Sequence, residues 1–181
     1  MGSFNSASKI ACNWGDYYGA LVGAGDLNND RDGDIVAVSR SGGFGSGCLY
    51  QWLGNGSGGF GSTTQIGCGW APYQHGLTGI GDLNGDGNAD LVSIHNDCLY
   101  RWYGNGGFGS TSTSSCGGWN DYDAHIAGMG DLDRDGIGDL LGYTYVGGDW
   151  CLYRWSGNGS GGLKGAVRLG CGGWGDYGLA R

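Results

Sequence analysis

Short apolar runs alternate with acidic, glycine-rich loops along this chain, and one kind of loop precedes one kind of apolar run three times. The segment GDLNNDRDGDIVAV at 25–38 recurs as GDLNGDGNADLVSI at 81–94 and as GDLDRDGIGDLLGY at 130–143. Each segment ends in a short apolar run, partly β-branched, which predicts a buried strand. Residues 20–25 predict another strand before the first loop. The acidic loops are therefore predicted to join two strands.

Two more strands are predicted in each repeat. A Cys-Leu-Tyr-x-Trp segment begins the third strand, a Gly-Asn-Gly turn follows, and the fourth strand ends at a second cysteine. Four short strands in a unit of roughly 50 residues are typical of a propeller blade. We therefore predict an all-β fold in a single domain, 1–181, with β-propeller-type blades as repeats at 20–76, 77–125 and 126–181. A compact, three-fold β-trefoil-like fold is the alternative.

The N-terminal region carries an additional copy of the fourth strand. Residues 4–14 match that strand, so 4–19 are predicted to form an extra strand and loop before the first blade. Cys12 then ends a fourth strand that has no third strand to pair with. Three blades are fewer than the usual four to eight of a closed propeller. Ring closure by self-association and membership of a longer array are both compatible with this pattern.

The acidic loops have the composition of a cation site. Side-chain oxygens at positions 1, 3, 5 and 9 suit a hard divalent cation, which binds six to eight oxygens. An EF-hand would carry a Glu at position 12, but this chain contains no Glu. Ordinary Asx-rich turns are the alternative, although unneutralised carboxylates this close would repel one another. We predict about three structural Ca²⁺ sites, with side-chain ligands Asp26, Asn28, Asp30, Asp34, Asp82, Asn84, Asp86, Asp90, Asp131, Asp133, Asp135 and Asp139.

Charge and cysteine content restrict the compartment and the partners. All 17 acidic residues are aspartates, eleven of them in the three loops, and the formal net charge is −8 with nine Lys plus Arg. Such a chain is poorly suited to nucleic acid, whose phosphates attract positive charge, and it has no apolar stretch long enough to span a membrane. Seven cysteines indicate an oxidising, extracellular environment and a secreted protein.

Six of the cysteines bracket the predicted hairpins in pairs. Folding at each Gly-Asn-Gly turn brings the two cysteines of a repeat within disulfide distance. Free buried thiols are the alternative, and zinc is disfavoured because no Cys-x-x-Cys pair is present. The predicted disulfides are Cys48 with Cys68, Cys98 with Cys116 and Cys151 with Cys171.

The run from LVGAGDLN through the acidic loop and strand to GNGSGGFGS resembles the FG-GAP/VCBS repeats of integrin α-subunit propellers and of secreted bacterial and fungal proteins. This resemblance implies a β-propeller with calcium in the turn between the first two strands of each blade. It also implies the backbone carbonyls at position 7, in Asp32, Asn88 and Ile137, as further ligands. The chain departs from the pattern at Arg31, where the other loops have glycine at position 6, so we expect a weaker first site.

A second repeated signature, Trp-x-x-Tyr, follows the fourth strand and is a candidate ligand site. Aromatic faces stack on the C–H surfaces of sugars, and carboxylates accept hydrogen bonds from sugar hydroxyls. Three copies carry an aspartate directly before the tyrosine. Packing between neighbouring blades is the alternative explanation, and the Tyr-x-Trp pairs of the third strands are expected in the core. The candidate ligand-binding residues are Trp14, Asp16, Tyr17, Trp70, Tyr73, Trp119, Asp121, Tyr122, Trp174, Asp176 and Tyr177.

Two functions are compatible with these motifs. The first is a secreted, multivalent lectin whose Trp-x-x-Tyr loops bind glycans, an interpretation that the resemblance to secreted family members supports. The second is an assembly module, in which residues 4–14 and Cys12 bind a second copy or another secreted chain by strand addition or a mixed disulfide. Catalysis is not expected, because no nucleophile and base break the repeat to form a unique site.

Overall fold

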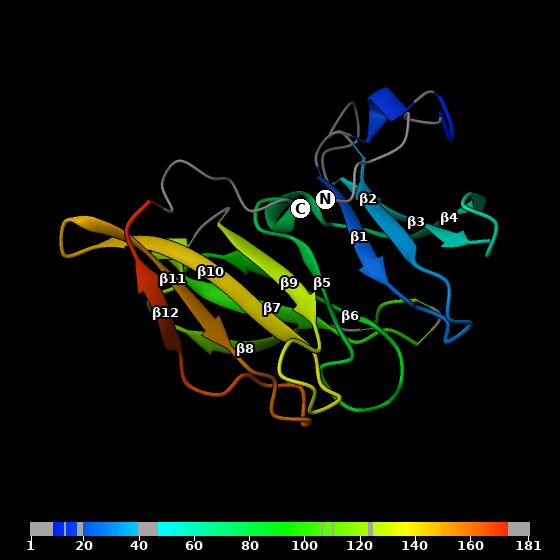
Figure 1. Cartoon of the computed structure of the whole chain (residues 1–181). Helices are drawn as coiled ribbons and strands as arrows, with labels where there is room; N and C mark the ends of the chain where they lie inside the picture. The colour runs from blue at the N-terminus through cyan, green and yellow to red at the C-terminus, as the bar shows by residue number, and fades with distance from the viewer. Residues whose placement is uncertain are drawn as a thin grey trace.

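The structure is a computed structural model that describes residues 9–12, 14–17, 20–39, 47–105, 107–109, 111–122 and 125–173. Within them the chain forms three four-stranded antiparallel sheets, which we call blades 1, 2 and 3 (Figure 1). Blade 1 comprises β1 (Ala20–Gly25), β2 (Asp34–Val38), β3 (Cys48–Gly54) and β4 (Phe60–Cys68). Blade 2 comprises β5 (Thr78–Gly81), β6 (Asp90–His95), β7 (Cys98–Trp102) and β8 (Ser112–Cys116). Blade 3 comprises β9 (Ile126–Gly130), β10 (Asp139–Val146), β11 (Asp149–Trp155) and β12 (Val167–Cys171).

Each blade is a meander in which consecutive strands are hydrogen-bonded neighbours. The second strand is the most apolar one and is covered on both faces, as the burial of every residue from Asp90 to Ile94 shows. The fourth strand is mostly polar and exposed, as in β4. This gradient follows from the sequence, because the apolar run directly after each acidic loop requires cover on both sides.

The blades stand side by side, with the first strand β5 of blade 2 between β1 and β9 (Figure 1). Glycines permit this close approach: a Cβ on Gly79 would lie 2.5 Å from the carbonyl oxygen of Gly23, and Gly128 meets the Gly79 carbonyl in the same way. One apolar cluster fills the space between blades 1 and 2, and a second fills the space between blades 2 and 3. The closest contacts between neighbouring blades are therefore those between the backbones of their first strands.

The predicted blade architecture is confirmed, and the β-trefoil-like alternative is wrong because the strands pair within three separate sheets. The predicted extra strand at 4–14 is not formed by its described residues 9–12, which belong to no strand. A fourth strand needs the edge of a third strand, and these residues have none beside them; residues 4–8 lie outside the described part. The helical segments described are 3₁₀ turns, η1 (Trp14–Asp16), η2 (Ala71–Tyr73) and η3 (Asn120–Tyr122). None of the described helices is long and apolar enough to cross a membrane.

Candidate functional site

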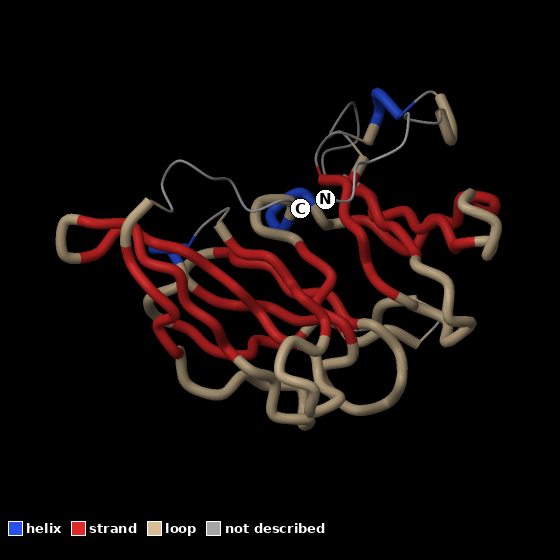
Figure 2. The backbone as a smooth tube through the Cα atoms, viewed as in Figure 1, coloured by secondary structure: helices blue, strands red, loops and turns tan. Residues whose placement is uncertain are grey.

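The three acidic loops share one fold, held by hydrogen bonds to the carboxylate at position 1. In the first loop Asp26 accepts hydrogen bonds from the backbone amides of Asp30 at 3.1 Å and of Arg31 at 2.7 Å. Asp82 and Asp131 accept the equivalent bonds in the other loops. The position 5 carboxylate in turn accepts the amide of position 7 in each loop. These bonds hold each acidic loop in a tight turn between the first two strands of its blade, and Figure 2 draws the loops in tan.

Two positions in each loop have a left-handed backbone. At position 6 the φ angles are 75° for Arg31, 91° for Gly87 and 87° for Gly136, which confirms the left-handed turn expected there. Arg31 therefore adopts a conformation that favours glycine. Position 4 is also left-handed, in Asn29, Gly85 and Arg134. The mixture of residue types at position 4 concealed this requirement, although Asn and Gly are the residues that tolerate it best.

The aspartate at position 9 ties each loop to the hairpin between the third and fourth strands. In blade 1 the carboxylate of Asp34 accepts the amide of Leu27 at 2.7 Å and the amide of Gly54 at 2.7 Å. The same two bonds recur in the other blades, from Leu83 and Gly104 to Asp90 and from Leu132 and Gly157 to Asp139. The loop motif indicates position 9 only as a ligand and does not reveal this second role. Its invariant burial could not be read from the loop motif.

Burial of these position 9 carboxylates changes their ionisation. Desolvation raises the pKa of Asp90 to about 6, although the backbone hydrogen bonds from Gly104 and Leu83 act in the opposite direction. Desolvation also raises the pKa of Asp34. Both groups are surrounded by further aspartates, whose charges oppose ionisation. A bound cation would reverse this preference by stabilising the carboxylate form.

The third loop brings three carboxylates close enough to share an ion. Ligand oxygens of Asp131, Asp133 and Asp139 all lie within 4.8 Å of one another. Calcium binds oxygens at about 2.3–2.6 Å, so two ligands of one ion lie at most about 5 Å apart. The spacing of these three carboxylates therefore fits a calcium shell.

The third loop also has basic neighbours. Arg154 lies 3.7 Å from the carboxylate of Asp133, and Lys164 lies 3.0 Å from the carboxylate of Asp135. The hydroxyl of Ser156 donates to Asp133 at 2.7 Å. The hydrogen bond and charge of Lys164 lower the pKa of Asp135. These contacts link the loop to β11 and to the hairpin that follows it.

The described Trp-x-x-Tyr residues lie between their own loop and the third-strand tryptophan of the blade that follows; two copies are at boundaries between blades, and Trp14 with Tyr17 precedes blade 1. Trp70 and Tyr73, which follow blade 1, pack on Trp102 of blade 2 with ring centroids 4.7 and 4.9 Å apart. The side chains of Trp70 and Trp119 are only 7% and 6% exposed. The other described copies repeat this packing, with Trp14 and Tyr17 on Trp52 (4.6 and 4.9 Å) and Trp119 and Tyr122 on Trp155 (5.3 and 4.9 Å).

This packing matches the alternative that the sequence left open. Of the Tyr-x-Trp pairs expected in the core, the third-strand tryptophans are buried, whereas Tyr50, Tyr100 and Tyr153 are only partly buried. Asp16 and Asp121 are exposed beside the aromatic contacts, whereas Trp174, Asp176 and Tyr177 lie outside the described residues. Tyr17, Tyr73 and Tyr122 are only partly buried. Sugar binding by this signature stays a prediction. It would involve the partly exposed tyrosines rather than the buried Trp70 and Trp119.

Comparison with protein families decides the nature of the repeat. A family described as an FG-GAP-like repeat matches residues 26–93 and again residues 82–142, which together span more than half of the chain. The chain belongs to the FG-GAP repeat family. Both matches begin at position 1 of an acidic loop, Asp26 and Asp82, so the family register coincides with the loop register. Comparison with curated proteins gives no match.

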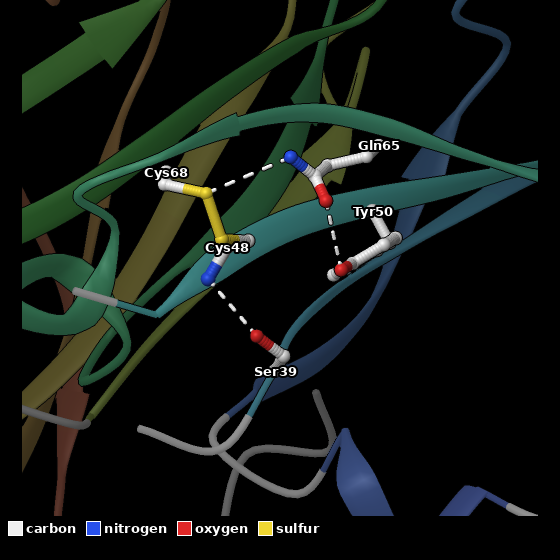
Figure 3. The surroundings of a disulfide bond; sticks show 5 residues. All are labelled: Ser39, Cys48, Tyr50, Gln65 and Cys68. Atoms are coloured by element: carbon white, nitrogen blue, oxygen red, sulfur yellow. Dashed lines mark hydrogen bonds between the residues drawn. A yellow bond between two sulfur atoms is a disulfide. The ribbon is translucent and has the colours of Figure 1, made fainter. Parts of the chain in front are cut away.

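Each FG-GAP blade is closed by a disulfide between its third and fourth strands, as predicted. Cys48 bonds to Cys68, and in that blade Tyr50 donates to Gln65, whose amide contacts the Cys68 sulfur (Figure 3). The other bridges are Cys98–Cys116 and Cys151–Cys171. Cys12 is exposed and free. Three disulfides fit an extracellular protein.

Cavities open beside the aromatic contacts at two equivalent places. A cavity of about 370 Å³ is lined by Trp119, Tyr122 and Trp155, with Ser115 and Lys164 at its polar side. A cavity of about 500 Å³ is lined by the equivalent aromatic residues Trp14, Tyr17 and Trp52. At the boundary between blades 1 and 2, Phe108 packs on Trp70 with ring centroids 6.2 Å apart. The repeat therefore builds an aromatic groove whose size varies from one copy of the Trp-x-x-Tyr signature to the next.

Among the described residues, blade 3 also carries an aromatic cluster with no counterpart at the β6–β7 turn of blade 2. Its β10–β11 hairpin is longer than the β6–β7 hairpin of blade 2, and Tyr145 and Trp150 face each other across it. Trp150 also contacts Tyr143 and His125, with ring centroids 5.4 and 5.7 Å away. Tyr145 is 60% exposed. In the sequence only Trp150 is evident as an unrepeated residue, because the register that groups it with Tyr145 depends on the hairpin length.

Proposed function

We propose that this FG-GAP repeat chain is a secreted, calcium-stabilised carbohydrate-binding protein that holds sugars in the aromatic grooves beside its third-strand tryptophans. The recurrence of one aromatic groove at two equivalent places of the repeat carries the proposal: one lies between blades 2 and 3, and the other lies on the N-terminal side of blade 1. In each groove Trp-x-x-Tyr residues meet a third-strand tryptophan, and the cavities of about 370 and 500 Å³ have the size of small-molecule sites. Aromatic edges and partly buried tyrosines offer apolar contact to sugar C–H groups.

Calcium is proposed to hold the loops that position these grooves. The residues that would bind it are the side chains at positions 1, 3, 5 and 9 and the carbonyl at position 7, an all-oxygen set that suits this ion. Its contribution is charge: it would offset the repulsion among the carboxylates and favour their ionised form. Lys164 connects the two regions, since it lines one groove and forms an ion pair with Asp135 of the third loop.

The test is binding to a glycan array in millimolar calcium, repeated after chelation. Saturable binding that disappears on chelation is expected. The variant Tyr17→Ala/Tyr122→Ala, which opens both grooves, is expected to lose at least tenfold in apparent affinity, because each aromatic contact contributes about 0.5–1.5 kcal/mol and repeated sites reinforce each other. Lys164→Ala, at an exposed groove residue, perturbs one groove without removing an aromatic residue. Arg168→Ala, an exposed basic residue on β12, is its matched control.

The outcomes separate the candidate sites. Absence of binding in both buffers by a protein with native circular dichroism would contradict the proposal. Binding that survives the double tyrosine substitution and disappears in Tyr145→Ala would move the sugar site to the aromatic cluster of blade 3. Binding that is unaffected by chelation, with calcium removal verified, would remove the proposed role of the ion.

Assembly with another protein is the second candidate, and a specific observation favours it. Large apolar side chains are exposed on the two end blades, with Leu21 at 51%, Met129 at 45% and Leu132 at 43%. Their equivalents inside the array are covered by a neighbouring blade. Patches of this kind mark interaction surfaces in soluble proteins.

A further inference from the structure

The two internal blade boundaries are built from the same contacts. The Gly23 carbonyl of blade 1 faces Gly79 of blade 2, and the Gly79 carbonyl faces Gly128 of blade 3. The acidic loops are joined as well: the carbonyl of Asp26 accepts the amide of Ala89 at 2.8 Å, and the carbonyl of Asp82 accepts the amide of Gly138 at 2.7 Å. Each blade therefore has a forward face, which presents carbonyls, and a rear face, which presents a glycine and an amide.

Among the described residues, burial along the repeat shows which forward face and which rear face are left exposed. On the forward face, Ala24 and Ile80 are completely buried, whereas the equivalent Met129 of blade 3 is 45% exposed. Leu27 and Leu83 are 2% and 0% exposed, and the equivalent Leu132 is 43% exposed. On the rear face, Leu77 directly before β5 and Ile126 at the start of β9 are each 1% exposed, while the equivalent Leu21 of blade 1 is 51% exposed. The exposed forward face belongs to blade 3 and the exposed rear face to blade 1.

We infer that two copies of this chain associate head to tail, with the forward face of blade 3 of one copy packed on the rear face of blade 1 of the other. The two exposed faces are the two halves of an interface that the molecule already forms twice. In the assembly, the Gly128 carbonyl meets Gly23 of the second copy, and the Asp131 carbonyl accepts the amide of its Gly33. This inference deepens the second candidate function and does not depend on sugar binding.

Blade 1 has room for this contact. A Cβ on Gly23 would meet no atom within 4 Å, whereas the same atom on Gly79 or Gly128 would collide with the preceding blade. An apolar cavity of about 520 Å³ lies on this face, between Leu21, Gly23 and the N-terminal residues 9–11. Trp14 and Tyr17 are already packed on Trp52, as the residues linking two blades are elsewhere. The second copy therefore needs to supply only the strands of its blade 3.

Two copies joined in this way complete each other. Each copy offers one forward and one rear face, so the same contact made twice closes a ring with two-fold symmetry. The ring contains six blades, which is within the usual four to eight. The exposed Met129, Leu132 and Leu21 become covered, and residues 9–12 lie at the outer rim of the contact.

The test is sedimentation velocity of the complete chain in millimolar calcium across a range of concentrations, together with two variants. A species of twice the monomer mass is expected. Gly23→Ala fills the rear face, and Met129→Asp places a charge on the forward face; each is expected to weaken association at least tenfold. Gly67→Ala is the matched control, since a Cβ there also meets nothing within 4 Å, on the outer strand β4. Melting temperatures equal to that of the unsubstituted chain would verify that each substitution alters its face without unfolding the protein.

Mixing the variants tests the head-to-tail arrangement itself. Gly23→Ala retains an intact forward face and Met129→Asp an intact rear face, so the mixture is expected to form a heterodimer more tightly than either variant self-associates. A chain that remains monomeric, a dimer insensitive to both variants, larger oligomers in place of the dimer, or a mixture that does not associate would each overturn the inference. Glycan binding by the Gly23→Ala variant tests the carbohydrate proposal independently of the association of two copies.

Discussion

Substitution of Gly79 by alanine tests whether backbone contact between first strands holds the blades together. A Cβ on Gly79 would lie 2.5 Å from the Gly23 carbonyl oxygen and 2.7 Å from the Ala24 Cα, both rigid backbone atoms. Ordinary contact begins near 3.4 Å, so one strand must move by about 0.9 Å. Overpacking of this kind lowers stability by about 1–3 kcal/mol. Alanine also reduces the conformational entropy of the unfolded chain, which offsets about 0.4–1 kcal/mol of that loss. We expect a net destabilisation of about 1–2 kcal/mol.

The matched control is Gly23→Ala, the same change at the equivalent position of blade 1, where a Cβ meets nothing within 4 Å. It is expected to leave stability unchanged or to raise it slightly. Urea unfolding followed by tryptophan fluorescence, with both variants verified as monomeric, should separate the two midpoints by about 1 M, given a slope of about 1–3 kcal/mol per M. Equal midpoints would refute the argument that the glycine is needed for close approach of the blades.

Further predictions concern single groups. Asp90→Ala removes the acceptor of two buried backbone amides and is expected to lower the free energy of unfolding by about 2–4 kcal/mol, as measured by urea unfolding against the exposed control Asp149→Ala. The double variant Cys98→Ser/Cys116→Ser opens a loop whose ends are 18 residues apart; a loss of about 3 kcal/mol is expected, and unchanged stability would contradict it. Burial raises the pKa of Tyr122 to about 12, while the unfolded phenol ionises near pH 10. The unfolded state therefore loses its proton first, and stability is expected to fall by about 1–2 kcal/mol between pH 10 and 12, less than the whole shift because Tyr122 is only partly buried. The fall should be smaller in Tyr122→Phe.

Local features of the fold were predictable because they depend on neighbours in the sequence. The strands around each acidic loop, the hairpin cysteines and the left-handed backbone at Arg31 all follow from residue type and spacing. The loops are turns because Asp, Asn and Gly tolerate the required backbone and bond to it. The buried role of Asp90 was not predictable, since its second partner, Gly104, is brought to it only when the sheet forms.

The sequence by itself determined the repeat: its register, its four strands, its disulfide pairs and the oxygen-rich loop. Each of these depends on a pattern within a single blade. Only the tertiary structure decided what happens between blades, because equivalent residues acquire different neighbours. In the sequence, Trp70 and Trp119 could equally belong to an exposed ligand-binding surface. Packing on the next blade buries both of them. Leu27 and Leu132 occupy the same position of the same motif, and one is buried while the other is exposed, because the first has a blade in front of it.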